Sequence, residues 1–187
     1  VMDEALSKEI LRTIIAPTLA GMREEGRPFT GVLYAGLMIC DGKPYVLEYN
    51  VRFGDPEAEV LLPRLDSDWI ELFEAALEGR LAEAKPRWKP GSAVCVVLAA
   101  AGYPANPRKG DEISGLDQAG AEAAVFHAGT ARQEGRWTTN GGRVLTVTAL
   151  GENLAAAVKQ AYAAVAKISF PGMHYRKDIA SRGLKRG

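Results

Sequence analysis

Hydrophobic residues recur every three or four positions at the start of the chain. Ala, Ile, Leu and Met occupy these positions between residues 5 and 22, and charged residues lie between them. The spacing predicts a helix over about 4–25, which Pro17 kinks because it cannot donate a backbone hydrogen bond, and which Gly26 ends. This helix begins almost at Val1 with no preceding segment, so we expect the chain to be part of a longer polypeptide.

Two apolar runs follow on either side of an Asp-Gly pair. Residues 31–39 are rich in Val, Leu, Tyr and Ile, and residues 43–51 again contain aromatic and branched side chains. Because Asp41-Gly42 favours a tight hairpin turn, the two runs are predicted to pair as antiparallel strands that are buried on at least one face. Helical spacing returns at 69–77 and predicts a short amphipathic helix after the hairpin.

The second half of the chain has the pattern of short strands closed by a helix. Its apolar runs are short, and Gly and Pro residues interrupt them. The pair Asn140-Gly141 is typical of a hairpin turn. The predicted elements are strands at 92–101 and 123–126, a loop at 102–110, a hairpin at 136–150 and an Ala-rich helix near 151–168.

The segment 84–91 separates the two halves. It contains two prolines and three basic residues, and it has no hydrophobic periodicity, as is usual for a connection between substructures. We therefore predict an α+β protein with a first domain at 1–84 and a small β-rich domain at 85–187.

Charge and composition narrow the classes of function. The 23 Lys and Arg residues balance 23 Asp and Glu residues, so no net charge favours a nucleic acid or an anionic membrane. Neither a membrane span nor a signal sequence is recognisable. Cys40 and Cys95 lie in apolar runs without a metal-binding motif, and we interpret both as buried residues of a protein in a reducing compartment. We expect a cytoplasmic protein.

The strand predicted at 43–51 places polar side chains on one face. Because side chains alternate along a strand, Glu48, Asn50 and Arg52 share the face opposite the apolar one. Neighbours on one face are about 6.5–7 Å apart, which lets Glu48 and Asn50 reach a cation between them. Hard oxygen ligands suit Mg²⁺, which takes its other ligands from phosphates and water. On spacing alone, exposure of both side chains to water is the more common outcome.

The residues after this strand favour a functional interpretation. Arg52 is followed by a loop that contains Gly54, Asp55 and Glu57. A guanidinium, a flexible glycine and two carboxylates beside a cation can hold an anionic phosphate or carboxylate together with an amine.

These motifs resemble those of a known family. The run Arg-Phe-Gly-Asp-Pro-Glu at 52–57, preceded by Glu48-Tyr49-Asn50, is similar to the signature of phosphoribosylamine-glycine ligases, or glycinamide ribonucleotide synthetases, of the ATP-grasp superfamily. At Glu59 the family usually carries Gln or Met. The resemblance covers essentially the whole chain, as the C-terminal portion of the enzyme, and includes residues 34–38, 126–130, 140–145 and 175–179.

The resemblance implies a fold and a reaction. The first domain would be the C-terminal part of an ATP-grasp domain, and the upstream part of the same polypeptide would supply its missing layers. We therefore expect a bare apolar surface on this domain. In the family's reaction, ATP phosphorylates the glycine carboxylate to glycyl phosphate, which the amine of 5-phosphoribosylamine attacks, with ADP and phosphate as by-products.

The resemblance also implies roles for individual residues. Glu48 and Asn50 would bind Mg²⁺ or Mn²⁺. Arg52 and Asp55 would be catalytic, and with Gly54 they would contact the substrates near glycine and the acyl phosphate.

The segment Asn140-Gly141-Gly142-Arg143 is a second candidate site. Its first interpretation is the hairpin turn. The amides of Gly141 and Gly142 beside the cation of Arg143 also suit the ribose 5-phosphate, so these three residues are candidate substrate contacts. His127, at the end of a short strand, is interpreted as a structural hydrogen-bonding residue.

Two alternatives stay open. The chain could belong to another ATP-grasp ligase or carboxylase, or it could be a non-catalytic binding module. The sequence has no phosphate-binding Gly-rich loop and no lysine-bearing strand of the type that grips nucleotide phosphates. We therefore expect little or no ligase activity from this chain alone.

Overall fold

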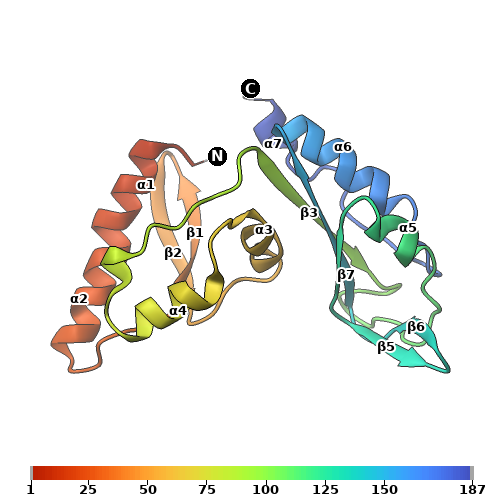
Figure 1. Cartoon of the computed structure of the whole chain (residues 1–187), viewed down its shortest axis with the longest axis horizontal. Coiled ribbons are helices and arrows are strands. Elements are labelled where there is room, and N and C mark those ends of the chain that lie inside the picture. Colours follow the sequence, from red (N-terminus) through yellow and green to blue (C-terminus); the bar gives the residue numbers. More distant parts are fainter. Residues whose placement is uncertain (1, 186–187) are drawn as a thin grey trace. The chain divides into compact units, whose positions relative to one another are not determined.

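The computed structural model describes residues 2–185 of the chain, which form two compact units (Figure 1). The first unit contains the described residues up to Asp55 together with Ser67–Arg87. The second contains Pro56–Asp66 and the described residues from Trp88 onward. The predicted domain boundary after residue 84 stays a prediction, but no sequence pattern indicated that 56–66 packs with the second unit.

The opening helix of the first unit changes its hydrogen-bonding pattern before the proline. It comprises α1 (Glu4–Ile10), a π-helical segment η1 (Leu11–Ile15) and α2 (Ala16–Glu24). In a regular α-helix the ring of Pro17 would collide with the carbonyl four residues earlier, and the wider π-helical turn accommodates it. The helix is thus irregular just before Pro17, as the proline led us to expect. Gly26, with φ +74°, follows the end of the helix.

The predicted hairpin is formed by β1 (Tyr34–Cys40) and β2 (Lys43–Asn50), which pair antiparallel. Asp41 and Gly42 both have positive φ, 50° and 76°, as the predicted two-residue turn requires. The hydroxyl groups of Thr18 on α2 and Tyr49 on β2 lie 2.8 Å apart and form a hydrogen bond between helix and hairpin.

The helix α4 (Trp69–Leu77) follows as predicted, and the 3₁₀ turn η2 (Leu81–Glu83) comes after it. The carboxylate of Asp68 caps α4 by accepting a hydrogen bond of 2.7 Å from the amide of Ile70. Gly79, with φ +73°, directly follows the C-cap residue.

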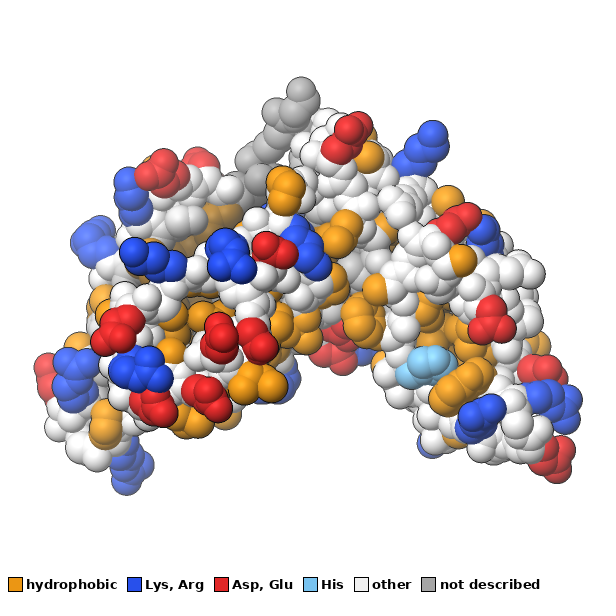
Figure 2. All heavy atoms as spheres, viewed as in Figure 1, with side chains coloured by type: hydrophobic (Ala, Val, Ile, Leu, Met, Phe, Trp, Pro, Cys, Tyr) orange, Lys and Arg blue, Asp and Glu red, His pale blue; other side chains and the backbone are white. Residues whose placement is uncertain are grey.

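Much of the apolar surface of the first unit is bare. Leu47 on β2 is 65% exposed, and Leu77 on α4 is 79% exposed. Figure 2 shows hydrophobic side chains at the surface among the charged ones. The expected bare surface is therefore confirmed. The prediction that the hairpin is buried on at least one face is wrong for the described residues, because β1 is only half-buried at residues 34–37 and β2 is mostly exposed.

The second unit is built on an antiparallel three-stranded sheet, whose strands in order are β3 (Ser92–Ala99), β7 (Arg143–Gly151) and β4 (Ala124–His127). The helix α6 packs on this sheet (Figure 1), and Val96, Leu98, Val147 and Ala161 are fully buried between them. The elements of the unit are α3 (Glu57–Arg64), β3 (Ser92–Ala99), α5 (Leu116–Gly120), β4 (Ala124–His127), β5 (Thr130–Gln133), β6 (Arg136–Thr139), β7 (Arg143–Gly151), α6 (Leu154–Val165) and α7 (Ser181–Leu184).

The predicted α+β architecture is confirmed, but two details of the second unit are wrong. The expected hairpin at 136–150 does not form, because β6 pairs with β5, and β7 pairs with β3 and β4. The tight turn is at Glu134-Gly135, where both residues have positive φ, whereas Asn140 and Gly141 do not.

The two cysteines differ in burial. Cys95 on β3 is buried, as predicted. Cys40 is exposed, so its prediction is wrong, because it ends β1 directly before the turn, where no described element covers it. Within residues 2–185, every helix falls short of the length and apolar content that a membrane span requires.

Glu59 on α3 carries a buried oxygen without a partner. Its Oε2 makes no hydrogen bond to any described residue. Because a partly buried charge is costly when one of its oxygens has no partner, and Gln keeps the shape of Glu without the charge, Glu59→Gln is expected to raise the free energy of unfolding by about 1 kcal/mol in urea denaturation. The exposed Glu152→Gln is the control for the lost charge. Equal stability of Glu59→Gln and the parent chain would contradict this reading of the oxygen.

Candidate metal and substrate sites

The side chains of Glu48 and Asn50 are in direct contact. Nδ2 of Asn50 donates a hydrogen bond of 3.1 Å to Oε1 of Glu48. Both residues lie on β2, opposite Gly36 and Tyr34 of β1. The prediction that Glu48 and Asn50 share one face of the strand is therefore confirmed.

This pair fits a divalent cation by its donor chemistry. A carboxylate and an amide oxygen are hard ligands, and the contact between the side chains brings them within reach of one ion. In the described part of the chain, no group of three or more His, Cys, Asp and Glu side chains is placed to hold a metal. An ion bound by Glu48 and Asn50 would therefore take its other ligands from phosphates and water, as Mg²⁺ does.

A bulge in β2 corrects the predicted alternation. Gly36 pairs with Glu48 and Leu37 pairs with Val46, so Leu47 has no partner on β1. A bulge interrupts the period of two, and the simple division of residues 45–51 into two faces fails there.

Arg52 does not share the strand face with the metal-ligand candidates. The strand ends at Asn50, and Arg52 lies in the bend that follows. Its Nη1 donates a hydrogen bond of 2.8 Å to the carbonyl oxygen of Phe53. The expectation that Arg52 continues the polar face of β2 is thus wrong, because the chain has left the extended conformation.

An aromatic cluster holds the loop after β2 against α4. The rings of Phe53 and Trp69 meet edge to face with centroids 5.5 Å apart, and Phe73 lies 6.3 Å from Phe53. Next to this anchor, Gly54 is buried and Asp55 is exposed. No sequence motif indicated that Trp69 and Phe73 would position the candidate substrate loop.

The second candidate site lies where the chain crosses itself at Gly129 and Gly141. A Cβ atom at Gly129 would lie 2.7 Å from Cα of Gly141 and 2.7 Å from the carbonyl oxygen of Arg143. The amide of Gly129 donates to that oxygen at 2.8 Å, and Gly129 accepts from the amide of Asn140 at 2.7 Å. At this crossing, the segment from Asn140 to Arg143 connects β6 of the two-stranded sheet to β7 of the three-stranded sheet.

Gly142 packs against a tyrosine that the sequence did not single out. A Cβ atom at Gly142 would lie 2.4 Å from Cδ2 of Tyr103, so only glycine leaves room for the ring. The Tyr103 ring also lies against His174, with centroids 6.5 Å apart. The structure thus brings Tyr103 to Gly142, one of the predicted substrate contacts.

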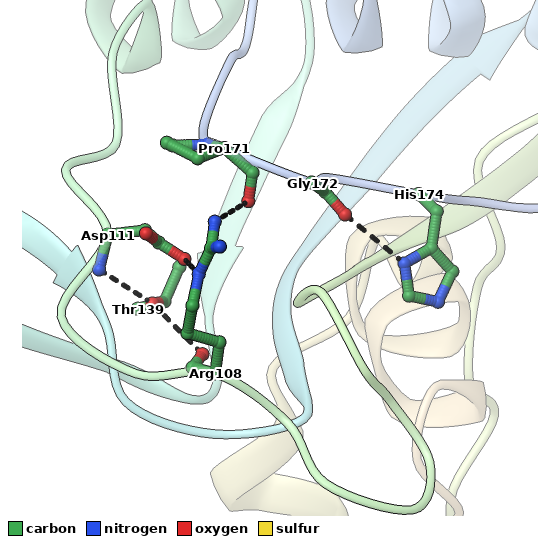
Figure 3. Close-up of polar contacts among 6 residues, drawn as sticks. All are labelled: Arg108, Asp111, Thr139, Pro171, Gly172 and His174. Carbon is green, nitrogen blue, oxygen red and sulfur yellow. Dashed lines mark hydrogen bonds and ion pairs between the residues drawn. The ribbon is translucent and has the colours of Figure 1, made fainter.

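Arg108 fastens the loop that carries Tyr103 (Figure 3). Its Nε donates to Oδ2 of Asp111 at 2.7 Å, and its Nη2 donates to the carbonyl oxygen of Pro171 at 3.0 Å. The amide of Asp111 donates to Oγ1 of Thr139 at 3.1 Å, so the loop is also tied to the end of β6. The signal for this network was weak, since Arg108 and Asp111 are ordinary loop residues in the sequence.

His127 has structural contacts, as interpreted from the sequence. Its Nδ1 lies 3.0 Å from Oγ1 of Thr130, and its ring centroid lies 4.1 Å from that of Trp137. The same unit contains an exposed charged pair, in which the side chain of Arg176 hydrogen-bonds Asp178 at 2.9 and 2.7 Å and lowers the pKa of that carboxyl below its ordinary value.

Comparisons with known families match two separate parts of the chain. Residues 1–58 match the ATP-grasp (A) domain of phosphoribosylglycinamide synthetase, and residues 93–182 match the C domain of the same synthetase. The two matched parts define a synthetase of the ATP-grasp class. The chain belongs to the phosphoribosylglycinamide synthetase family.

Individual relatives show the same relationship. The chain is 53% identical to a phosphoribosylamine–glycine ligase of Neisseria meningitidis over its whole length, and 50% identical to one of Caulobacter vibrioides over 99% of its length. It spans 44% of the length of each of these relatives, which is less than half.

Solved structures extend the comparison to the fold. The crystal structure of a phosphoribosylamine–glycine ligase from Thermotoga maritima matches with a TM-score of 0.82 and 40% identity. The match covers 95% of this chain and 44% of the Thermotoga chain. The structure of a urea carboxylase from Kluyveromyces lactis matches with a TM-score of 0.50 and 15% identity, over 72% of this chain and 12% of the carboxylase chain. The second likeness is one of fold alone.

Proposed function

We propose that the polypeptide to which this chain belongs joins glycine to 5-phosphoribosylamine, with ATP as co-substrate, in purine biosynthesis. In this proposal the chain is the C-terminal part of a cytoplasmic phosphoribosylamine-glycine ligase. The full-length protein comprises this chain and the upstream part that its relatives' greater length implies. The observation that supports the proposal most is the contact between Glu48 and Asn50, directly before Arg52–Glu57, in a chain that matches both the A and the C domain.

The first site is proposed to act in phosphoryl transfer to the carboxylate of glycine. Such a transfer depends on positioning and on cationic groups that offset the charge of the phosphates. Glu48 and Asn50 would hold Mg²⁺ or Mn²⁺, which supplies that positive charge when bound. Arg52 would bind the glycine carboxylate and the acyl phosphate that it becomes.

The same loop is proposed to receive the amine. Asp55 is exposed and has the charge to hold the amine of 5-phosphoribosylamine close to the acyl phosphate, and we place Gly54, directly before it, in contact with the same substrates. Arg52 and Asp55 are therefore the residues that we propose to be catalytic.

The second site is proposed to bind the phosphate of 5-phosphoribosylamine. Gly141 and Gly142 present backbone without side chains, and Arg143 adds a cation next to them. Tyr103, which packs on Gly142, would form a wall of this site.

The exposed apolar surface of the first unit supports the need for a further part of the protein. Exposed side chains such as Leu47, Ile70 and Leu77 are the kind that a neighbouring layer covers. The upstream part of the same polypeptide is the proposed occupant, and it would bring the nucleotide-gripping residues that are missing here.

The test is phosphate release that requires ATP, glycine and 5-phosphoribosylamine together. The full-length protein is expected to release phosphate only with all three, and the isolated chain is expected to release none above background. Turnover with another amine or with bicarbonate instead would favour a different ATP-grasp ligase or carboxylase. Turnover by the isolated chain would contradict the need for an upstream part.

A further inference from the structure

Gly36 lies directly opposite the metal-ligand candidate Glu48. In the register of the hairpin, Gly36 pairs with Glu48, and Tyr34 pairs with Asn50. Residues that oppose each other in an antiparallel pair point to the same face, with Cβ atoms about 4.5–5.5 Å apart. A side chain on Gly36 would therefore compete for the space that Glu48 occupies.

The Glu48 side chain lies over the place where a Cβ of residue 36 would be. A Cβ at Gly36 would come within 2.9 Å of Cγ and 3.6 Å of Oε1 of Glu48. Oε1 is the atom that accepts the hydrogen bond from Asn50. The contact between the two proposed ligands thus depends on the missing side chain at residue 36.

The backbone at Gly36 does not itself require glycine. Gly36 is not among the residues with positive φ, so any L-residue can adopt its conformation. Glycine in the middle of a strand is less stable than alanine by about 0.5–1 kcal/mol. The glycine therefore weakens the strand, and its advantage lies in the room that it leaves for Glu48.

The bulge next to Gly36 adds to this arrangement. Leu47, directly before Glu48, has no partner on β1, and the irregularity falls between Gly36 and Leu37. Bulges bend a strand and redirect the neighbouring side chain. Next to this bulge, the Glu48 side chain lies over Gly36, with its Oε1 in contact with Asn50 of the same strand.

We propose that Gly36 is a positioning residue, whose missing side chain holds the carboxylate of Glu48 beside Asn50 so that both can bind one divalent cation. This inference rests on the proposed metal role of Glu48 and Asn50. A methyl group at residue 36 would push the exposed Glu48 side chain into another rotamer and leave the backbone in place.

The test is Gly36→Ala in the full-length protein, measured by Mn²⁺ binding in the presence of ATP, with electron paramagnetic resonance as the readout. Mn²⁺ affinity is expected to fall about 10- to 100-fold, as when a metal ligand loses its support. The melting temperature is expected to stay the same or rise, which a purely structural role would not give. Gly21→Ala is the matched control, since Gly21 lies in the same unit with nothing within 4 Å of its Cβ position.

A double substitution shows whether Gly36 acts through Glu48. Because alanine has no Cγ atom, adding Gly36→Ala to Glu48→Ala is expected to cause no further loss of Mn²⁺ affinity. Unchanged Mn²⁺ affinity in Gly36→Ala, or a further loss in the double variant, would overturn the inference, as would unchanged affinity in Glu48→Ala. Mn²⁺ binding does not need turnover, so a parent protein without ligase activity would overturn the proposed function alone.

Discussion

Glu48→Gln in the full-length protein is expected to lower kcat by about 10²–10³-fold, the range seen when one group that stabilises transition-state charge is removed. Glutamine keeps the shape of the side chain but loses the negative charge that binds the cation. Because Glu48 is exposed, the free energy of unfolding should change by less than about 0.5 kcal/mol. The measurement is phosphate release at saturating ATP, glycine and 5-phosphoribosylamine, over a series of Mg²⁺ concentrations.

Asn50→Ala is the companion variant, and Glu24→Gln is the control for a lost carboxylate. Asn50→Ala should also reduce turnover, and raised Mg²⁺ should restore part of the activity in both variants, because the defect is in holding the cation. Glu24 is exposed on α2, away from β2 in sequence, so its variant should behave like the parent. Parental turnover in Glu48→Gln and Asn50→Ala would favour the alternative of a non-catalytic binding module.

Gly129→Ala is expected to have a large effect on stability, with a loss of about 3 kcal/mol in the free energy of unfolding. The new Cβ would meet three backbone atoms within 3 Å, one of Arg143 and two of Gly141. Backbone atoms in a hydrogen-bonded crossing cannot move aside as the end of a side chain can, so the crossing must open. Urea denaturation of the chain, followed by circular dichroism, measures the loss.

Gly120→Ala is the control for this variant in the same unit. Nothing lies within 4 Å of its Cβ position, and its φ is not positive, so alanine should be neutral or slightly stabilising there. A Gly129→Ala chain as stable as Gly120→Ala would mean that the crossing of Gly129 and Gly141 is looser than described.

Local signals in the sequence were sufficient for most individual elements. The hairpin turn at Asp41-Gly42, the cap of α4 at Asp68 and the Ala-rich helix α6 depend on neighbouring residues, which a pattern can capture. The contact between Glu48 and Asn50 followed in the same way from the period of a strand.

Pairing between distant segments could not be predicted in the same way. Asn140-Gly141 has the composition of a hairpin turn, yet the chain continues from one sheet to another, because β7 finds its partners in β3 and β4. The bulge at Leu47 and the packing of Tyr103 on Gly142 likewise depend on residues far apart in sequence or on register. The family resemblance supplied candidate residues there, but not their geometry.

The central position of β7 has a consequence for synthesis on the ribosome. In the three-stranded sheet, β3 and β4 each pair with β7, which is translated last of the three. At about 5–20 residues per second, the roughly 40 residues between β3 and β7 take several seconds to appear. During that interval the apolar strand β3 lacks β7 as a partner in the nascent chain. The three-stranded sheet therefore forms only after β7 has been synthesised, and chaperones can bind the unpaired β3 until then.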